Sequence, residues 1–194
     1  GLSRQHEVVA MTRHDLDIAD AVAARDLVSS VCPDLIVNCA AYNQVDAAEK
    51  DALSALSANA WGVRTLAGVA TEIGATLVHF STDFVFDGRA TQPYTEADAP
   101  NPRGTYGVSK LTGEFFAVDC PRHYILRVES LFGGRHARSS VDKIAANIRS
   151  GAEVRAFSDR TVSRTFVDDA VMATVELLER SSPPGVYHCV ISGM

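Results

Sequence analysis

A tyrosine and a lysine lie four residues apart in the segment TYGVSK, at Tyr106 and Lys110. The chain has five tyrosines and only three lysines, and Tyr106 is the only tyrosine followed by a lysine at this spacing. Residues four apart share one face of a helix. A fixed positive charge beside a phenol lowers its pKa, so the phenol can exchange a proton with a carbonyl or alcohol oxygen near neutral pH. The alternative is a pair of neighbouring surface residues.

Two hydroxyl residues precede this pair, at Ser81 and Thr82 in HFSTDFVFDG, and Thr82 lies 24 residues before Tyr106. They follow an apolar run that predicts a strand, and open α/β sheets bind ligands at the carboxyl ends of their strands. A hydroxyl there can donate a hydrogen bond to the same substrate oxygen that the tyrosine protonates. The alternative is that both hydroxyls only satisfy backbone groups in a turn.

The elements that would position these residues alternate between strands and helices. Asp17 is expected to cap the first helix, Gly74 to end the second, and residues 83–104 to form a long ordered loop. Repeated strand–helix–strand units predict a doubly wound parallel sheet with helices on both faces, in one domain over residues 1–194. Strands are expected at residues 6–11, 34–40, 76–81, 123–128, 153–157 and 185–190, and helices at 17–32, 48–73, 106–118, 141–151 and 167–180.

Composition excludes several classes of protein. Of the 194 residues 46% are hydrophobic and 22% charged, as in ordinary globular domains. A formal charge of −6 and a pI near 5.5 argue against binding to nucleic acid or to an anionic membrane. The four cysteines show neither CxxC spacing nor partnering histidines, which indicates a reducing cytoplasm and neither a disulfide framework nor a metal site.

One signal of a dinucleotide-binding fold is missing. The glycine-rich turn that normally follows the first strand has no match anywhere in the chain. The opening residues GLSRQ look like the tail of a helix, and the last residues stop just after a strand. We therefore expect a fold that lacks its first strand and glycine turn, because the sequence is cut at both ends, and we expect this chain to bind dinucleotide poorly.

Four blocks carry a family resemblance: VNCAAYNQVDAAE, HFSTDFVFDG, PNPRGTYGVSKLTGE and FVDDAVMAT. In this order they resemble the extended short-chain dehydrogenase/reductase superfamily, and within it the dTDP-4-dehydrorhamnose reductase family. The resemblance implies a catalytic set of Thr82, Tyr106 and Lys110. It further implies NADPH- or NADH-dependent reduction of the 4-keto group of a nucleotide-linked 6-deoxy sugar, with residues 129–166 on the substrate side, and it allows a homodimer.

The choice of cofactor can be argued from Thr12 and Arg13, which directly follow the first expected strand. An acidic residue there would favour NADH, whereas an arginine can pair with the 2′-phosphate of NADPH. We therefore expect a preference for NADPH, the alternative being that Arg13 is a solvated turn residue. The resemblance adds further cofactor-binding residues, in addition to Tyr106 and Lys110: Asp17, Ile18, Cys39, Ala40, Ala41, Asn59 and Ser81.

The chain departs from the family pattern near the expected sugar pocket. Asp83 and Phe84 follow Thr82, where related dehydratases need a glutamate at the second position to abstract a proton. Dehydration is therefore disfavoured. Arg164 stands where the family commonly has proline, and it either meets a diphosphate or is a solvated loop residue. Asp83, Phe84 and Arg164, with Thr82, are the expected substrate residues.

Two other functions compete with the reductase. A non-catalytic binding or regulatory relative, such as the regulatory β subunit of methionine adenosyltransferase, would fit the missing glycine turn. An epimerase of the same superfamily would recycle its cofactor and consume none. The intact set of Thr82, Tyr106 and Lys110 favours the enzyme.

Overall fold

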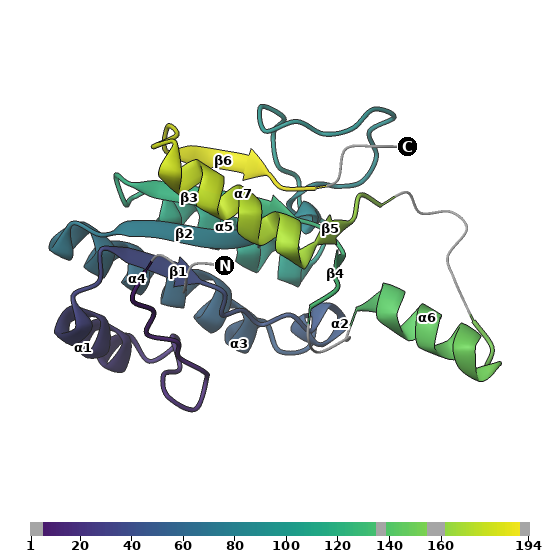
Figure 1. Ribbon diagram of the computed structural model, residues 1–194, viewed down its shortest axis with the longest axis horizontal. Coiled ribbons are helices and arrows are strands. Elements are labelled where there is room, and N and C mark those ends of the chain that lie inside the picture. Colours follow the sequence, from purple (N-terminus) through teal and green to yellow (C-terminus); the bar gives the residue numbers. More distant parts are fainter. Residues whose placement is uncertain (1–5, 135–138, 155–161, 191–194) are drawn as a thin grey trace. The chain divides into compact units, whose positions relative to one another are not determined.

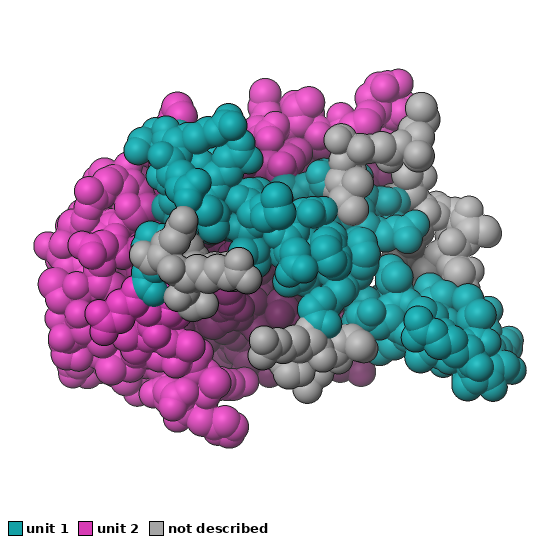
Figure 2. Space-filling view, viewed as in Figure 1, with its two compact units in different colours: residues 1–6, 128–182, 189–194 teal, residues 7–127, 183–188 magenta. Residues whose placement is uncertain are grey.

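The structure is a computed structural model that describes residues 6–134, 139–154 and 162–190. Its contacts divide the chain into two compact units, which Figure 2 colours separately. Unit 2 comprises residues 7–127 and 183–188, and unit 1 comprises residues 1–6, 128–182 and 189–194. Each unit is described by itself.

A four-stranded sheet forms the centre of unit 2, in the order β1-β2-β3-β6 (Figure 1). β1 pairs with β2 in parallel, and so does β3 with β6. This sheet confirms the expected α/β class. The strands are β1 (Leu35–Asn38), β2 (Thr76–Thr82), β3 (His123–Val128) and β6 (Gly185–His188).

Helices cover this sheet and bury its core. α4 (Gly62–Ile73) and α5 (Thr105–Ala117) pack against β2 and against each other, and α1 (Ala21–Val31) packs against α4. The core between these helices and the strands consists of small and branched apolar side chains. Its fully buried members include Val63, Val69, Leu77 and Ile125.

The long helix expected at residues 48–73 is divided. A short helix α2 (Val45–Ala48) ends first, and helical structure resumes at α3 (Ala52–Leu56) because the Asp51 side chain caps the Ser54 N–H. A π-helical turn, η2 (Ser57–Trp61), then leads into α4. Gly74, with φ of 70°, ends α4 as predicted.

Two predictions at the start of the chain are wrong. The strand expected at residues 6–11 is an exposed irregular segment, since no described strand pairs with it and its apolar run is short. Asp17 does not cap the first helix. Asp20 does, because its carboxylate accepts the N–H groups of Val22 and Ala23, and Asp17 instead caps a turn at the Ala19 N–H.

Unit 1 is built on a smaller pairing of two strands, β4 (Leu131–Phe132) and β5 (Thr165–Phe166), which run parallel. The Thr165 hydroxyl donates to the Cys189 carbonyl and accepts from the Glu129 N–H, so it links three segments of the unit. α7 (Val167–Glu179) packs against β5. α6 (Ser140–Ser150) begins with a capping box at Ser139 and buries none of its residues. The strand expected at 153–157 lies mostly outside the described residues.

None of the helices in the described part of the chain combines the length and the apolar character that crossing a bilayer requires.

Candidate active site

The carboxyl end of β2 carries the first group of candidate residues. Ser81 and Thr82 lie at this strand end, as the apolar run before them predicted, and both are buried. The Thr82 hydroxyl donates to the Asp83 carboxylate at 2.9 Å and accepts the Phe84 N–H at 3.2 Å, which starts the 3-10 turn Asp83–Val85. Its single proton is therefore directed at Asp83. To donate to a substrate oxygen, Thr82 has to leave Asp83 or Asp83 has to be protonated.

Helix α5 carries the second group. Tyr106 and Lys110 lie in its first two turns and are both buried, so they are not a solvated surface pair. Two glycines bring this helix close to its neighbours. A Cβ on Gly107 would lie 2.3 Å from the Phe84 carbonyl oxygen, and a Cβ on Gly113 would lie 2.1 Å from the Asn59 carbonyl oxygen. Both distances are far below contact, so these positions require glycine.

Tyr106 lies beside β2 and the turn that follows it. The Phe84 ring meets the Tyr106 ring edge-on, with centroids 5.5 Å apart. Burial is the main reason that the Tyr106 pKa is raised above its ordinary value; the Asp83 charge adds to this, and a hydrogen bond with Thr82 opposes it. The net shift is upward, contrary to the expectation from the sequence that a lysine four residues on would lower this pKa. The phenol is therefore protonated at neutral pH.

Lys110 is fixed by the backbone of β2. Its Nζ donates to the Phe80 carbonyl at 2.6 Å. Burial lowers the Lys110 pKa to about 8, and the charges of Glu114 and Cys39 oppose this shift. The ammonium is therefore still the main form at pH 7, although its pKa lies only about one unit above that pH.

Asn59 connects the segment after β1 to α5. It lies in the π-turn η2, a kind of turn that often marks functional sites. Its amide oxygen accepts the Tyr42 N–H at 2.8 Å, and its amide nitrogen donates to the Tyr42 carbonyl and to the Ser109 hydroxyl. Ser109 donates in turn to the Tyr106 carbonyl. Asn59 is thus fully occupied in fixing the site's framework and is not a solvated helix residue.

The residues after β1 offer small side chains at the same end of the sheet. Cys39 and Ala40 are exposed and Ala41 is half-buried, whereas Asn38 before them is buried. The Asn38 amide interacts with the ring of His79 on β2 at 3.2 Å and also accepts the Ala40 N–H. The chain therefore leaves the strand at Cys39–Ala41 with small, partly exposed residues.

A cofactor fits the polar groups at this end of the sheet. The Ser81 hydroxyl is buried and has no partner within the protein, so it can bond a ligand that lies over the end of β2. Tyr106 and Lys110 on α5 and the exposed residues Cys39 and Ala40 after β1 belong to the same region, because β1 and α5 both pack against β2. These are groups that can bond the hydroxyls and amide of a nicotinamide riboside.

The remaining cofactor candidates lie in an exposed turn. The Thr12 N–H and hydroxyl both donate to Asp15, and Arg13 forms a 3.2 Å ion pair with Asp17. The Arg13 side chain is 86% exposed, so it is available to a phosphate. Ile18 is buried in the core, where it packs closely against Gly62.

Arg164 belongs to unit 1, where it is exposed next to Thr165. Thr82 and Tyr106 belong to unit 2, so a role of Arg164 on the substrate side stays a prediction. Asp83 and Phe84, the other substrate candidates, lie directly beside Tyr106: Phe84 is 44% exposed, and burial raises the pKa of Asp83.

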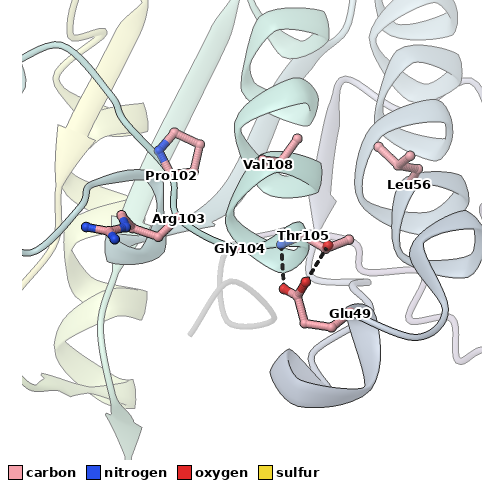
Figure 3. Close-up of a pocket in the computed structure, with 7 residues that line it drawn as sticks. All are labelled: Glu49, Leu56, Pro102, Arg103, Gly104, Thr105 and Val108. Atoms are coloured by element: carbon pink, nitrogen blue, oxygen red, sulfur yellow. Dashed lines mark hydrogen bonds between the residues drawn. The ribbon is translucent and has the colours of Figure 1, made fainter.

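A pocket lies at the N-terminal end of α5 (Figure 3). There the Glu49 carboxylate accepts both the N–H and the hydroxyl of Thr105, at 2.7 and 2.9 Å. Glu49 thus caps the helix that carries Tyr106. The residues that line the pocket are Glu49, Leu56, Pro102, Arg103, Gly104, Thr105 and Val108.

Sequence reasoning missed several residues that build this site. Glu49 caps α5 from 56 positions away, and His79 and Asn38 meet across two strands. Glu114 and Arg127 form a buried ion pair. The four-residue spacing from Lys110 could have drawn attention to Glu114, but no local pattern indicates Arg127 as its partner. Among the described residues, no group of three or more His, Cys, Asp or Glu side chains could hold a metal ion.

The parallel sheet and the cluster of Thr82, Tyr106 and Lys110 at the end of β2 define an α/β protein of the extended short-chain dehydrogenase/reductase type. A model of the family "RmlD substrate binding domain" matches residues 1–194. The chain belongs to this family.

Named relatives agree. The chain is 37% identical over 191 residues to the spore coat polysaccharide biosynthesis protein SpsK of Bacillus subtilis, a match that covers 97% of this chain and 66% of the relative. It is 32% identical over 182 residues to the dTDP-4-dehydrorhamnose reductase of Escherichia coli, covering 91% of this chain and 60% of that one. The chain thus spans less than two thirds of the length of these relatives.

Solved structures show the same likeness. The crystal structure of the dTDP-4-dehydrorhamnose reductase of Bacillus anthracis in complex with NADP has a TM-score of 0.93 and 31% identity, covering 98% of this chain and 68% of that one. An orthologue from Clostridium acetobutylicum has a TM-score of 0.93 and 32% identity, over 99% and 68% of the two chains. The resemblance inferred from the four sequence blocks is therefore confirmed.

Proposed function

We propose that this protein reduces the 4-keto group of a nucleotide-linked 6-deoxy sugar and uses NADPH, or NADH, as the reductant. The observation that carries the proposal is the placement of Thr82, Tyr106 and Lys110 together at the carboxyl end of β2, in a chain whose relatives include dTDP-4-dehydrorhamnose reductases. The solved neighbour that binds NADP supports the choice of cofactor.

In this proposal the bound nicotinamide supplies the hydride, and the protein supplies the proton. Tyr106 is protonated at neutral pH and donates its phenolic proton to the sugar oxygen. Thr82 orients the same oxygen once its proton is released from Asp83. Lys110 binds the ribose of the cofactor and stabilises the phenolate that Tyr106 becomes.

The other site residues have binding roles. Ser81 and the segment Cys39–Ala41 hold the nicotinamide end, and Asn59 fixes the framework behind them. Thr12, Arg13 and Asp17 hold the adenosine end, and Ile18 supports their turn from the core. Phe84 and Asp83 face the sugar, and residues 129–166, including Arg164, contribute to the substrate side. We further propose a homodimer in the cytoplasm, where four free cysteines fit a reducing environment.

An absorbance assay tests this proposal. The full-length protein is incubated with NADPH and dTDP-4-keto-6-deoxy sugars while oxidation of the reduced cofactor is followed, and the assay is repeated with Tyr106→Phe. We expect steady consumption by the wild type and a rate roughly 10²- to 10⁴-fold lower in the variant.

The competing functions give other results. An epimerase converts the sugar without net consumption of NADPH, and a binding protein leaves both the sugar and the cofactor unchanged. Either result with correctly folded wild-type protein contradicts the reductase proposal.

A further inference from the structure

Three charged side chains are buried side by side on α5 and β3. Lys110 and Glu114 on α5 are each 3% exposed, and Arg127 on β3 is 5% exposed. Buried charges are costly unless they are paired, so a group of three calls for an explanation. Only Lys110 belongs to the catalytic set described above.

Arg127 holds the Glu114 carboxylate in one position. Its Nε donates to Oε1 at 2.9 Å and its Nη2 donates to Oε2 at 2.7 Å, so both carboxylate oxygens are engaged. The guanidinium also lies over the Phe86 ring, 5.0 Å from its centroid. A carboxylate bound in this bidentate way cannot turn to other partners. It can act on Lys110 only through space.

Glu114 follows Lys110 by four residues on α5, so the two lie on the same face of the helix. Arg127 approaches the carboxylate from the neighbouring strand. The ion pair therefore presents its negative member on the helix face that carries Lys110. Because the two side chains are buried, water screens this attraction little.

The other groups around Lys110 cannot replace Glu114. The Phe80 carbonyl binds Nζ but carries no net charge. His79 is fully buried, and its pKa is well below the ordinary value, so it is neutral near pH 7. Cys39 helps only as a thiolate, and although the residue is partly open to solvent, the protein around its thiol raises the thiol pKa.

We propose that Glu114, fixed by Arg127, is a positioning residue that keeps the buried Lys110 charged and so sets the alkaline limit of the enzyme's working range. The inference rests on the proposed function, in which the Lys110 ammonium takes part. It assigns to the Glu114–Arg127 pair an electrostatic role in addition to packing.

The direction of the Lys110 shift supports this role. Burial lowers the Lys110 pKa to about 8, and Glu114 is the largest of the influences that raise it. Without the carboxylate, the same burial would make Lys110 neutral at a lower pH. A further fall of about one unit in the Lys110 pKa would bring it to about pH 7, where half of the lysine would be uncharged.

The test compares four proteins: wild type, Glu114→Gln, Glu114→Asp and Lys110→Met. Their free energies of unfolding are measured from pH 6 to pH 10.5. The folded-state pKa of Lys110, about 8, is below its unfolded value of 10.5. Between these values the unfolded chain binds more protons, so wild-type stability should rise with pH relative to Lys110→Met.

In Glu114→Gln this rise should begin at a pH lower by roughly one unit or more, because the neutral amide no longer offsets the burial of Lys110. Glu114→Asp keeps the charge, so its rise should begin near that of the wild type even if the protein is less stable. If Glu114→Gln fails to fold, Glu114→Gln/Arg127→Gln replaces it, since that variant leaves no unpaired guanidinium.

The pH dependence of turnover gives a second readout. The alkaline fall in kcat/KM should move to lower pH in Glu114→Gln and return in Glu114→Asp. If the Lys110-dependent rise in stability begins at the same pH in Glu114→Gln and wild type, Glu114 is only a packing residue and the inference is wrong. The stability measurement needs no turnover, so it decides this point even if the protein reduces no sugar and the proposed function fails.

Discussion

Two parts of unit 2 are proposed to bind the same cofactor, but they are built very differently. Around Tyr106 and Lys110, buried side chains are fixed by hydrogen bonds and by contacts that allow only glycine at positions 107 and 113. Around Thr12 and Arg13, the chain is exposed and is held by local bonds to Asp15 and Asp17. The groups that would perform chemistry are positioned in advance, whereas those that would recognise the adenosine end are free to adapt to it.

The largest effect on stability should come from adding a methyl group to the tight contact between α5 and η2. Gly113→Ala places a methyl group against the Asn59 carbonyl and should lower the free energy of unfolding by about 1–3 kcal/mol or more. Gly68→Ala is the matched control on α4, because the nearest atom to its new Cβ is 3.8 Å away. That variant should gain up to about 1 kcal/mol from helix propensity. Equal effects in a urea titration would mean that α5 is not tightly packed.

A smaller effect, on the pKa of Tyr106, is expected from a substitution in the turn after β2. Asp83→Asn removes the negative charge that helps to raise the Tyr106 pKa, so this pKa should fall. An absorbance titration of the phenolate measures it, with the Tyr106→Phe spectrum subtracted to remove the other tyrosines. An unchanged titration would show that Asp83 does not act on Tyr106.

The smallest effect on folding should be found in the exposed turn. Arg13→Ala breaks an ion pair whose arginine is 86% exposed, so stability should change by less than about 0.5 kcal/mol. The preference for NADPH over NADH should nevertheless fall severalfold, because the 2′-phosphate loses a charged partner. Arg180→Ala, at another exposed ion pair, is the control and should leave the preference unchanged. A large loss of stability in Arg13→Ala would mean that the exposed turn is as tightly held as the buried site around Tyr106.

The same contrast explains what the sequence could predict. Tyr106, Lys110 and Thr82 were identified because helical spacing and the end of an apolar strand are local patterns, and the structure buries all three at one end of the sheet. Gly74 and the strand at 123–128 were predicted for the same reason. Local sequence patterns were enough where a residue's position depends on a single helix or strand.

Interactions between distant segments were not predictable in this way. Nothing local indicates that Glu49 caps the helix at Thr105, or that Arg127 holds Glu114. The effect of Lys110 on Tyr106 was also misjudged, because burial dominates the tyrosine's pKa and only the folded chain determines burial. The strand expected at 6–11 failed since a strand needs a partner, which its own residues do not specify.

The central claim is that the buried cluster on β2 and α5 carries out a reduction at the sugar's keto carbon. The most direct measurement uses NADPH with deuterium at the transferable position and locates the label in the product by NMR. We predict one deuterium at C4 of the sugar with the wild-type protein, and no labelled product in the same time with Tyr106→Phe. A sugar product that carries no deuterium, or carries it at another carbon, would contradict the account.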